Sequence, residues 1–271
     1  MRTGRVFAPT LILLLAGCSG GAAAPSASGT TSAPGGGSLT VYAAASLGPV
    51  LARVKDAYEA ANPGTTLTIS TDSSSALETK IEQNAPSDLF LSADTTNPQK
   101  LEDQGLASGS IVRFAGNLLT IIVPSANPAG IRSPSDLAKR GVKIIAAGDA
   151  VPITKYATQL VANLGRESGY PANFAEAYAV NVVSKEDNVA AVVSKVELGE
   201  GDAGIVYATD AKTSTKVKTI AVPVSANVPA TYGGVVVMAS PNKSVASAFL
   251  TWLAGTDGQA IFASFGFLPA S

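Results

Sequence analysis

The sequence has no histidine and only one cysteine, Cys18, among its 271 residues. These absences exclude histidine general bases, His/Cys metal sites, paired redox cysteines and internal disulfides. Charged residues make up only 14% of the chain, and the formal net charge is −1 with no basic cluster, so no nucleic-acid partner is expected. The composition argues against most hydrolases and metalloenzymes. We therefore expect a protein that is not an enzyme and that holds neither a cofactor nor a metal cation.

The first 18 residues have the pattern of a targeting segment. Arg2 and Arg5 precede an apolar run over residues 6–16 that is too short to span a bilayer. The run ends in Leu-Ala-Gly-Cys at residues 15–18, which resembles the lipobox of bacterial lipoproteins. By that resemblance, cleavage makes Cys18 a lipidated N-terminus that anchors an extracytoplasmic protein to the cell membrane. The alternative is an ordinary signal peptide with an incidental cysteine.

Residues 19–38 contain only glycine, alanine, serine, proline and threonine. They carry no charge and no large apolar side chain, so they cannot build a core and are expected to form a flexible tether. The globular part is expected to begin near Leu39.

From Leu39 onward, short apolar strands alternate with helices. The predicted strands lie at 39–44, 66–70, 88–92, 117–123, 142–147, 178–183, 203–207, 217–222 and 233–238. The predicted helices lie at 47–61, 75–84, 98–104, 134–140, 154–164, 188–198, 242–253 and 256–264. This alternation predicts an α/β fold with mostly parallel sheets and enough chain for two lobes. No internal repeat is visible in the sequence.

Four strand-to-helix junctions are candidates for a binding site. In open α/β sheets, ligands bind beyond the C-terminal ends of the strands. Unpaired N–H groups and the helix dipole attract anions there. At the first junction Ser46 lies between a strand and a helix, and the alternative for it is a simple N-cap. The junctions are AAASL at 43–47, TDSSSALETKIE at 71–82, GDAVPITKYA at 148–157 and KEDNVAAVV at 185–193.

Six motifs occur in an order that resembles one known family. They are AAASL, SSSALETKIEQNAPSDLFLSAD at 73–94, GDAVP at 148–152, EDNV at 186–189, GDAGIVYATDA at 201–211 and SFGFL at 264–268. Together they resemble the periplasmic molybdate-binding proteins of ABC importers over essentially all of residues 39–271. The resemblance implies a two-lobed type II periplasmic binding protein fold with a ligand cleft between the lobes. Residues 39–119 and 236–271 would form one lobe, and residues 120–235 the other.

The resemblance also implies a function and a set of ligand groups. The chain would capture molybdate, and also tungstate, as a monomer, and deliver the oxyanion to an ABC transporter permease. The matched ligand positions are the side chains of Ser46, Ser74 and Tyr207 and the backbone N–H groups of Ile153 and Val189. The sequence departs from the family at Ile153-Thr154, where a small Ala-Gly pair is frequent. It departs again at Gly233, where a proline is usual after the tyrosine.

Neutral hydroxyl and N–H donors suit a fully ionised oxyanion. They satisfy its oxygens without a buried counter-charge, and they offer few acceptors to a protonated anion. Four carboxylates lie close in sequence to these donors and must face away from the anion or cap a helix: Asp72, Asp149, Glu186 and Asp187. The chain has no histidine, and its hydroxyl donors have pKa values of about 10 or above. The affinity is therefore expected to vary little around neutral pH.

Three other functions are compatible with the sequence. The same site could serve sulfate or another tetrahedral oxyanion, because the sequence does not measure the size of the cavity. A Ser/Lys hydrolase could use Ser74 with Lys80 or Lys155, although the chain has no SxxK motif around Ser74 and no GxSxG motif. A purely structural surface lipoprotein would bind no ligand.

Overall fold

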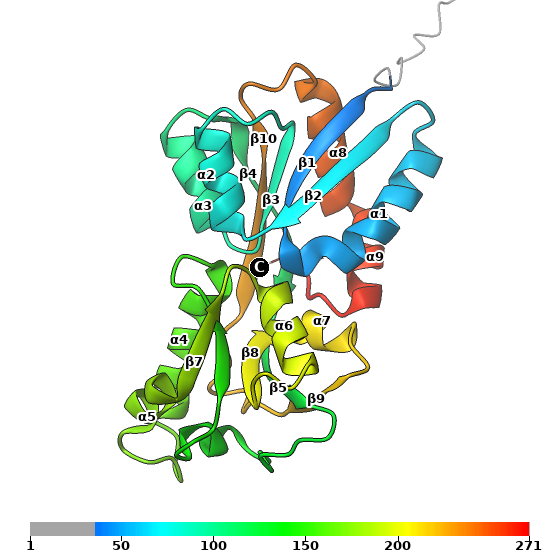
Figure 1. Ribbon diagram of the computed structural model, residues 1–271. Coiled ribbons are helices and arrows are strands. Elements are labelled where there is room, and N and C mark those ends of the chain that lie inside the picture. The colour runs from blue at the N-terminus through cyan, green and yellow to red at the C-terminus, as the bar shows by residue number, and fades with distance from the viewer. Residues whose placement is uncertain (1–35, 271) are drawn as a thin grey trace, which may run out of the picture. The chain divides into compact units, whose positions relative to one another are not determined.

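Two five-stranded sheets organise residues 36–270, which the computed structural model describes (Figure 1). In spatial order, the strands of the first sheet are β2 (Thr66–Asp72), β1 (Ser38–Ala44), β3 (Leu89–Ser92), β10 (Ala230–Val237) and β4 (Ala107–Asn117). The strands of the second sheet are β7 (Val182–Glu186), β6 (Ile144–Ala147), β8 (Ala203–Tyr207), β5 (Leu119–Pro124) and β9 (Val217–Ile220). With their helices, these sheets form the predicted α/β architecture.

Both sheets are mixed, so the prediction of mostly parallel sheets was wrong. β1 pairs in parallel with β2 and β3, while β10 is antiparallel to both of its neighbours. In the second sheet β6 pairs in parallel with β7 and β8, while β5 is antiparallel to β8 and β9. The antiparallel pairs arise because β5 and β10 each enter from the other sheet. β10 enters at the edge where β3 ends, and β5 enters at the edge where β8 ends, so each runs opposite to that neighbour.

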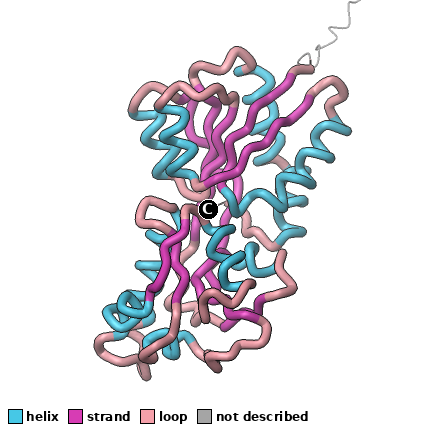
Figure 2. Tube along the Cα trace, in the orientation of Figure 1, coloured by secondary structure: helices cyan, strands magenta, loops and turns pink. Residues whose placement is uncertain are grey.

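Helices lie on both sides of each sheet, as Figure 2 shows in the same orientation. With the first sheet are α1 (Gly48–Ala61), α2 (Ser74–Glu82), α3 (Thr96–Asp103), α8 (Lys243–Ala254) and α9 (Thr256–Phe265). With the second are α4 (Pro152–Leu164), α5 (Phe174–Asn181), α6 (Val189–Glu197) and α7 (Ala208–Lys212). Two 3₁₀ turns, Ala45–Leu47 and Pro134–Ala138, complete the described elements. In Figure 1, α2 and α3 cover one side of the first sheet, and α1, α8 and α9 cover the other.

Several segments differ from the predicted elements: the helix predicted at 134–140 is a 3₁₀ turn, α7 was not predicted, and two larger differences involve α5 and β4. Residues 178–183 were predicted as a strand, but α5 continues to Asn181 and β7 begins only at Val182. Alanine and glutamate in this helix favour α-helix more strongly than its few β-branched residues favour a strand. β4 was not predicted before residue 117 because glycine and serine interrupt its apolar pattern. Gly116 in this strand pairs with Leu268, and a Cβ at Gly116 would lie 2.8 Å from the carbonyl oxygen of Pro269.

The chain passes between the sheets twice. It leaves the first sheet after Asn117 and returns to it before Ala230. Asn227 in the returning segment ties the two passages together, since its amide accepts from the N–H of Leu119 at 3.0 Å and donates to the Leu119 carbonyl at 2.9 Å. The lobe boundary that the sequence placed between residues 235 and 236 falls inside β10, which pairs only with strands of the first sheet.

No helix within residues 36–270 is long and apolar enough to cross a membrane. Cys18 and residues 19–35 of the predicted tether lie outside the described residues.

Candidate functional site

All five residues that the sequence singled out as ligand positions lie around one small cavity. The cavity has a volume of about 10 Å³, close to the space that one water molecule needs. The residues that line it are Ala44, Ala45, Ser46, Ser73, Ser74, Ala93, Val151, Pro152, Ile153, Asn188, Val189 and Tyr207. They come from the C-terminal ends of strands in both sheets and from the starts of the helices that follow. The four predicted junctions therefore meet at one place.

Ser46 lies in the 3₁₀ turn between β1 and α1, and it is 5% exposed. Its hydroxyl is 3.0 Å from the phenol oxygen of Tyr232. The residue before α1 is Leu47, and no side chain caps that helix. The alternative that Ser46 acts only as an N-cap is therefore wrong.

The three serines at 73–75 have different roles. The Ser73 hydroxyl caps α2 by accepting from the N–H of Ala76 at 3.3 Å. Ser74 is fully buried, and its hydroxyl oxygen accepts from the N–H of Ala93 at 3.0 Å. The hydroxyl hydrogen of Ser74 is left to donate elsewhere. Ser75 lies 3.5 Å from Ser73, oxygen to oxygen, and does not line the cavity.

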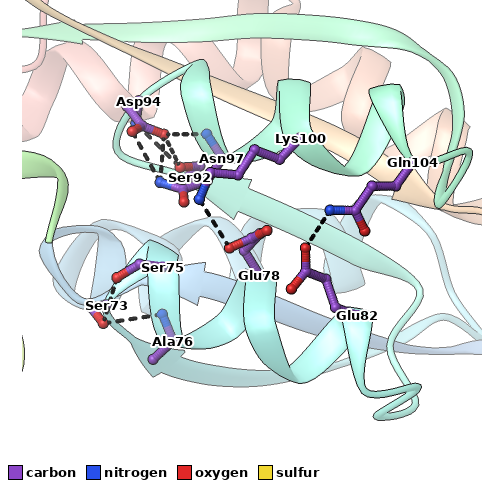
Figure 3. A network of polar contacts seen from close by, with 10 residues as sticks. All are labelled: Ser73, Ser75, Ala76, Glu78, Glu82, Ser92, Asp94, Asn97, Lys100 and Gln104. Atoms are coloured by element: carbon purple, nitrogen blue, oxygen red, sulfur yellow. Dashed lines mark hydrogen bonds and ion pairs between the residues drawn. The ribbon is translucent and has the colours of Figure 1, made fainter. Parts of the chain in front are cut away.

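The turn after β3 positions the Ala93 donor, and Figure 3 shows the polar contacts that hold it. The Asp94 carboxylate accepts from the Ser92 hydroxyl at 2.8 Å, from the backbone N–H of Asn97 at 3.1 Å and from the Asn97 amide at 3.0 Å. The N–H of Gly233 donates to the Asp94 carbonyl at 3.2 Å. A proline at position 233 could not make this last bond, so the departure from the family pattern here adds a link between β10 and the turn.

The second sheet contributes two helix starts to the cavity. Pro152 and Ile153 are the first residues of α4, and Val189 is the first residue of α6. The N–H groups of a first helical turn have no intrahelical partner, and they carry the positive end of the helix dipole. The Asn188 side chain caps α6 by accepting from the N–H of Ala191 at 3.1 Å. Two helix starts, which attract anions, therefore line the cavity together with the two serines.

The unusual Ile153-Thr154 pair fits this arrangement. The Thr154 hydroxyl lies 2.8 Å from the Gly148 carbonyl and 3.1 Å from the Ala147 carbonyl. It fastens the turn before α4, while the Ile153 side chain is 2% exposed and packs in the core. The side chain of Ile153 therefore lies away from solvent, and the residue still lines the cavity.

Tyr207 ends β8 and is 1% exposed. Burial, followed by the neighbouring Tyr232, raises the pKa of the Tyr207 phenol well above its usual value, so the hydroxyl keeps its proton. Among the described residues, this hydroxyl has no hydrogen-bond partner. An unpaired buried hydroxyl is costly unless a ligand satisfies it. Tyr207 is therefore a free donor at the cavity.

The nearby carboxylates lie outside the cavity, along a separate groove of about 470 Å³. Asp72 pairs with Lys80 at 3.1 Å, Asp149 with Lys185 at 2.5 Å and Glu186 with Lys195 at 2.9 Å. Asp187 is exposed. Burial alone would raise the pKa of Asp72, but the hydrogen bonds from Lys80 and the Ser73 N–H outweigh it and lower the pKa. Three of the four charges are therefore paired with lysines, and the fourth is exposed to solvent.

Ser74 is not arranged as a hydrolase nucleophile. The Lys80 ammonium is engaged by Asp72, and no lysine is among the described residues that line the cavity. Ser74 therefore has no base beside it to accept its proton, as a Ser/Lys mechanism requires.

Asp210 is a buried acid near the site that the sequence did not single out. It is the third residue of α7, and its carboxylate accepts from the backbone N–H of Tyr207 at 3.1 Å. Burial raises its pKa from 3.8 to about 7, against the opposing effect of that hydrogen bond. Ionised Asp210 would oppose an anion bound beside Tyr207. We therefore expect the affinity for an oxyanion to fall as the pH rises through about 7, and no longer to be flat around neutral pH.

Asp210→Asn is expected to remove a pH dependence of stability. The folded protein keeps a proton on Asp210 that the unfolded chain releases between pH 3.8 and about 7. The stabilisation is therefore fully present below the unfolded pKa and is lost as the pH rises through the folded one, with an upper limit of about 4 kcal/mol. Urea unfolding from pH 5 to 8 should show wild type losing stability relative to the variant. A constant difference between the two proteins would contradict the titration.

Comparison with known proteins places the chain among solute receptors. Residues 39–268 match the family model described as bacterial extracellular solute-binding protein. The molybdate-binding protein ModA of Mycobacterium tuberculosis is 32% identical over 231 residues, covering 85% of this chain and 84% of that protein. A Bacillus subtilis protein, provisionally assigned as an ABC transporter substrate-binding lipoprotein, is 30% identical over 264 residues, covering 97% of this chain and 96% of its own.

The solved structures that share the fold include two oxyanion receptors. The periplasmic molybdate-binding protein of Azotobacter vinelandii has a TM-score of 0.72 at 24% identity, covering 86% of this chain and 100% of that one. The sulfate-binding protein SubI of Mycobacterium tuberculosis has a TM-score of 0.76 at 20% identity, covering 86% of each chain. Receptors named for two different oxyanions therefore have this fold, and the fold alone does not select the anion.

Proposed function

The chain belongs to the family of bacterial extracellular solute-binding proteins, and we propose that it captures molybdate and delivers it to the permease of an ABC transporter. The family consists of solute-binding proteins and not of enzymes. The curated relatives that support molybdate as the ligand match the chain over most of its globular length. We also propose that it acts as a monomer, with both sheets of the one chain contributing residues to the cavity.

One observation supports this proposal: residues from the four junctions and Tyr207 at the end of β8 line one cavity. The five donors that we propose are the hydroxyls of Ser46, Ser74 and Tyr207 and the N–H groups of Ile153 and Val189. An unpaired dianion in a medium of low polarity costs tens of kcal/mol. Each helix start offsets part of that cost with roughly half a positive charge. The site therefore suits a fully ionised tetrahedral oxyanion.

Tungstate belongs to the same proposal because it has the same charge and shape as molybdate. Sulfate is the competing ligand, since it is also a tetrahedral dianion and a sulfate-binding protein shares the fold. Selection between them depends on how far the cavity expands around the anion.

Melting of the purified protein with four oxyanions tests the function. Molybdate at 1,000 times its Kd should add about 4 kcal/mol to the stability of the folded state. For a domain of this size that corresponds to a rise in Tm of about 10 °C. Tungstate should act similarly, and sulfate and phosphate should have much smaller effects. Equal, negligible shifts for all four anions would remove the binding function, and a shift with sulfate alone would reassign the ligand.

We further propose that the protein is anchored to the membrane through a lipid on Cys18. The support is the Leu-Ala-Gly-Cys pattern at residues 15–18, and similarity to the Bacillus subtilis relative that extends through 97% of this chain. Cys18→Ser should abolish lipid labelling and release the protein from membranes, with molybdate affinity unchanged. Metabolic lipid labelling and membrane fractionation measure both effects. A lipid-labelled Cys18→Ser protein would show that the anchor is elsewhere.

A further inference from the structure

Three buried polar side chains form a hydrogen-bonded series that leads to the cavity. The series starts at the end of β4, where the chain passes between the sheets. The Asn117 amide nitrogen lies 3.3 Å from the phenol oxygen of Tyr232, and that oxygen lies 3.0 Å from the Ser46 hydroxyl. Asn117 is 1% exposed and Tyr232 is fully buried. Asn117 ends β4, Tyr232 lies in β10 and Ser46 follows β1. Three distant parts of the sequence therefore meet in one hydrogen-bonded series.

The direction of each hydrogen bond in this series follows from the partners of Asn117. The backbone N–H of Leu118 donates to one side-chain atom of Asn117 at 3.0 Å, so that atom must be the amide oxygen. The other atom is then the nitrogen, and its two hydrogens go to the Thr209 hydroxyl at 2.8 Å and to Tyr232. Tyr232 accepts from Asn117, so its single proton is free to point at Ser46.

We propose that Tyr232, oriented by Asn117, is a positioning residue that forces the Ser46 hydroxyl to act as a donor toward the bound oxyanion. Ser46 receives the Tyr232 proton on its oxygen, so its own hydrogen is directed into the cavity. Tyr232 does not line the cavity and acts only through Ser46. This inference rests on the proposed function and adds to it a reason why the site discriminates by protonation.

Ser74 is oriented in the same way, but by a backbone N–H group instead of a tyrosine. Its oxygen accepts from the N–H of Ala93, which leaves only its hydrogen for the ligand. Each serine therefore has an acceptor site occupied by the protein and a donor free. Burial, followed by the nearby Asp210, raises the pKa of the Tyr232 phenol well above its usual value, so its proton stays in place at physiological pH. An anion that carries a proton finds few acceptors here.

The test is a double-mutant cycle with Tyr232→Phe and Ser46→Ala, measured by calorimetry with molybdate. Phenylalanine keeps the ring that packs against Phe114, Tyr207 and Phe267. Loss of one neutral hydrogen bond should weaken binding about three- to tenfold in the wild-type background. In the Ser46→Ala background the same change should alter affinity less than about twofold. Tyr58→Phe is the control, since it removes a buried phenol in α1 away from the cavity.

A second readout is specific to the donor role. Phosphate carries at least one proton near neutral pH, and Ser46 without its Tyr232 partner can rotate to accept that proton. The ratio of phosphate affinity to molybdate affinity should therefore rise in Tyr232→Phe and stay unchanged in Tyr58→Phe. Equal losses in both backgrounds of the cycle, or an unchanged ratio, would overturn the positioning role. Wild-type protein that binds no oxyanion would instead remove the proposed function, and this inference with it.

Discussion

Ser46→Ala, Ser74→Ala and Tyr207→Phe are each expected to weaken molybdate binding by about one to two decades. A hydrogen bond to a charged group is worth about 1.5–3 kcal/mol, which corresponds to that loss. The reason lies in the free donors: the Tyr207 hydroxyl has no partner among the described residues, and the Ser74 oxygen already accepts from Ala93. Calorimetry on each purified variant measures the effect.

Ser75→Ala is the matched control for Ser74→Ala. Ser75 follows Ser74 in the same helix turn but does not line the cavity, so its affinity for molybdate should stay near wild type. Ser74→Ala also leaves the Ala93 N–H without its acceptor, which should lower the free energy of unfolding by about 1–3 kcal/mol. Wild-type affinity in both Ser46→Ala and Ser74→Ala would place the binding site elsewhere.

Val189→Pro should remove a backbone donor without breaking its helix. Val189 is the first residue of α6, a position that tolerates proline because its N–H has no intrahelical partner. Asn188 before it is extended, with φ −155° and ψ 170°, close to the conformation that a residue before proline prefers. Molybdate affinity should fall by about one to two decades. Because the Val189 side chain is 4% exposed and packs in the core, its replacement should also lower the free energy of unfolding, by about 1–2 kcal/mol.

Thr256→Pro is the corresponding control at a helix start away from the cavity. Thr256 is the exposed first residue of α9 and follows Gly255, which is extended at φ −84° and ψ −177°. Calorimetry and urea unfolding on both proline variants should show an affinity loss only at Val189. A folded Val189→Pro protein with wild-type affinity would exclude this N–H from the site.

The convergence of the candidate groups was predictable because each lies where a strand ends and a helix begins. Strand ends of that kind share one edge of a sheet, so local patterns predict Ser46 beside Ser74 and Ile153 beside Val189. That the two sheet edges meet at one cleft was implied only by the resemblance to a two-lobed family. Tyr232 and Asn117 could not be found in this way. Tyr232 bonds to Ser46 across 186 residues and to Asn117 across 115, and no local pattern encodes such a contact.

The mixed direction of the sheets escaped prediction for a related reason. Strand pairing is decided between distant segments, and hydrophobic periodicity reports only whether a segment is extended. The error at 178–183 had a local cause, since this mainly apolar run with one asparagine fits both a short strand and the end of a helix. Alanine is a strong helix former, and it favours the helical conformation that α5 has up to Asn181.

The two sheets share one strand order, in which β2, β1, β3, β10 and β4 correspond to β7, β6, β8, β5 and β9 with the same directions of pairing. Ser46 and Ile153 follow corresponding strands, and so do Ser74 and Val189. The cavity therefore consists of two half-sites related by an approximate internal symmetry that the sequence does not reveal. The first sheet contributes side-chain hydroxyls, Ser46 and Ser74, each of which is lost on a single exchange to alanine. The corresponding positions of the second sheet, Ile153 and Val189, contribute backbone N–H groups, which any exchange that preserves packing leaves in place, except an exchange to proline. Tyr207 at the end of β8 adds one side-chain donor to the second half. Side-chain substitutions should therefore reduce ligand binding more often in the first half of the pocket than in the second, although the two halves have nearly the same architecture.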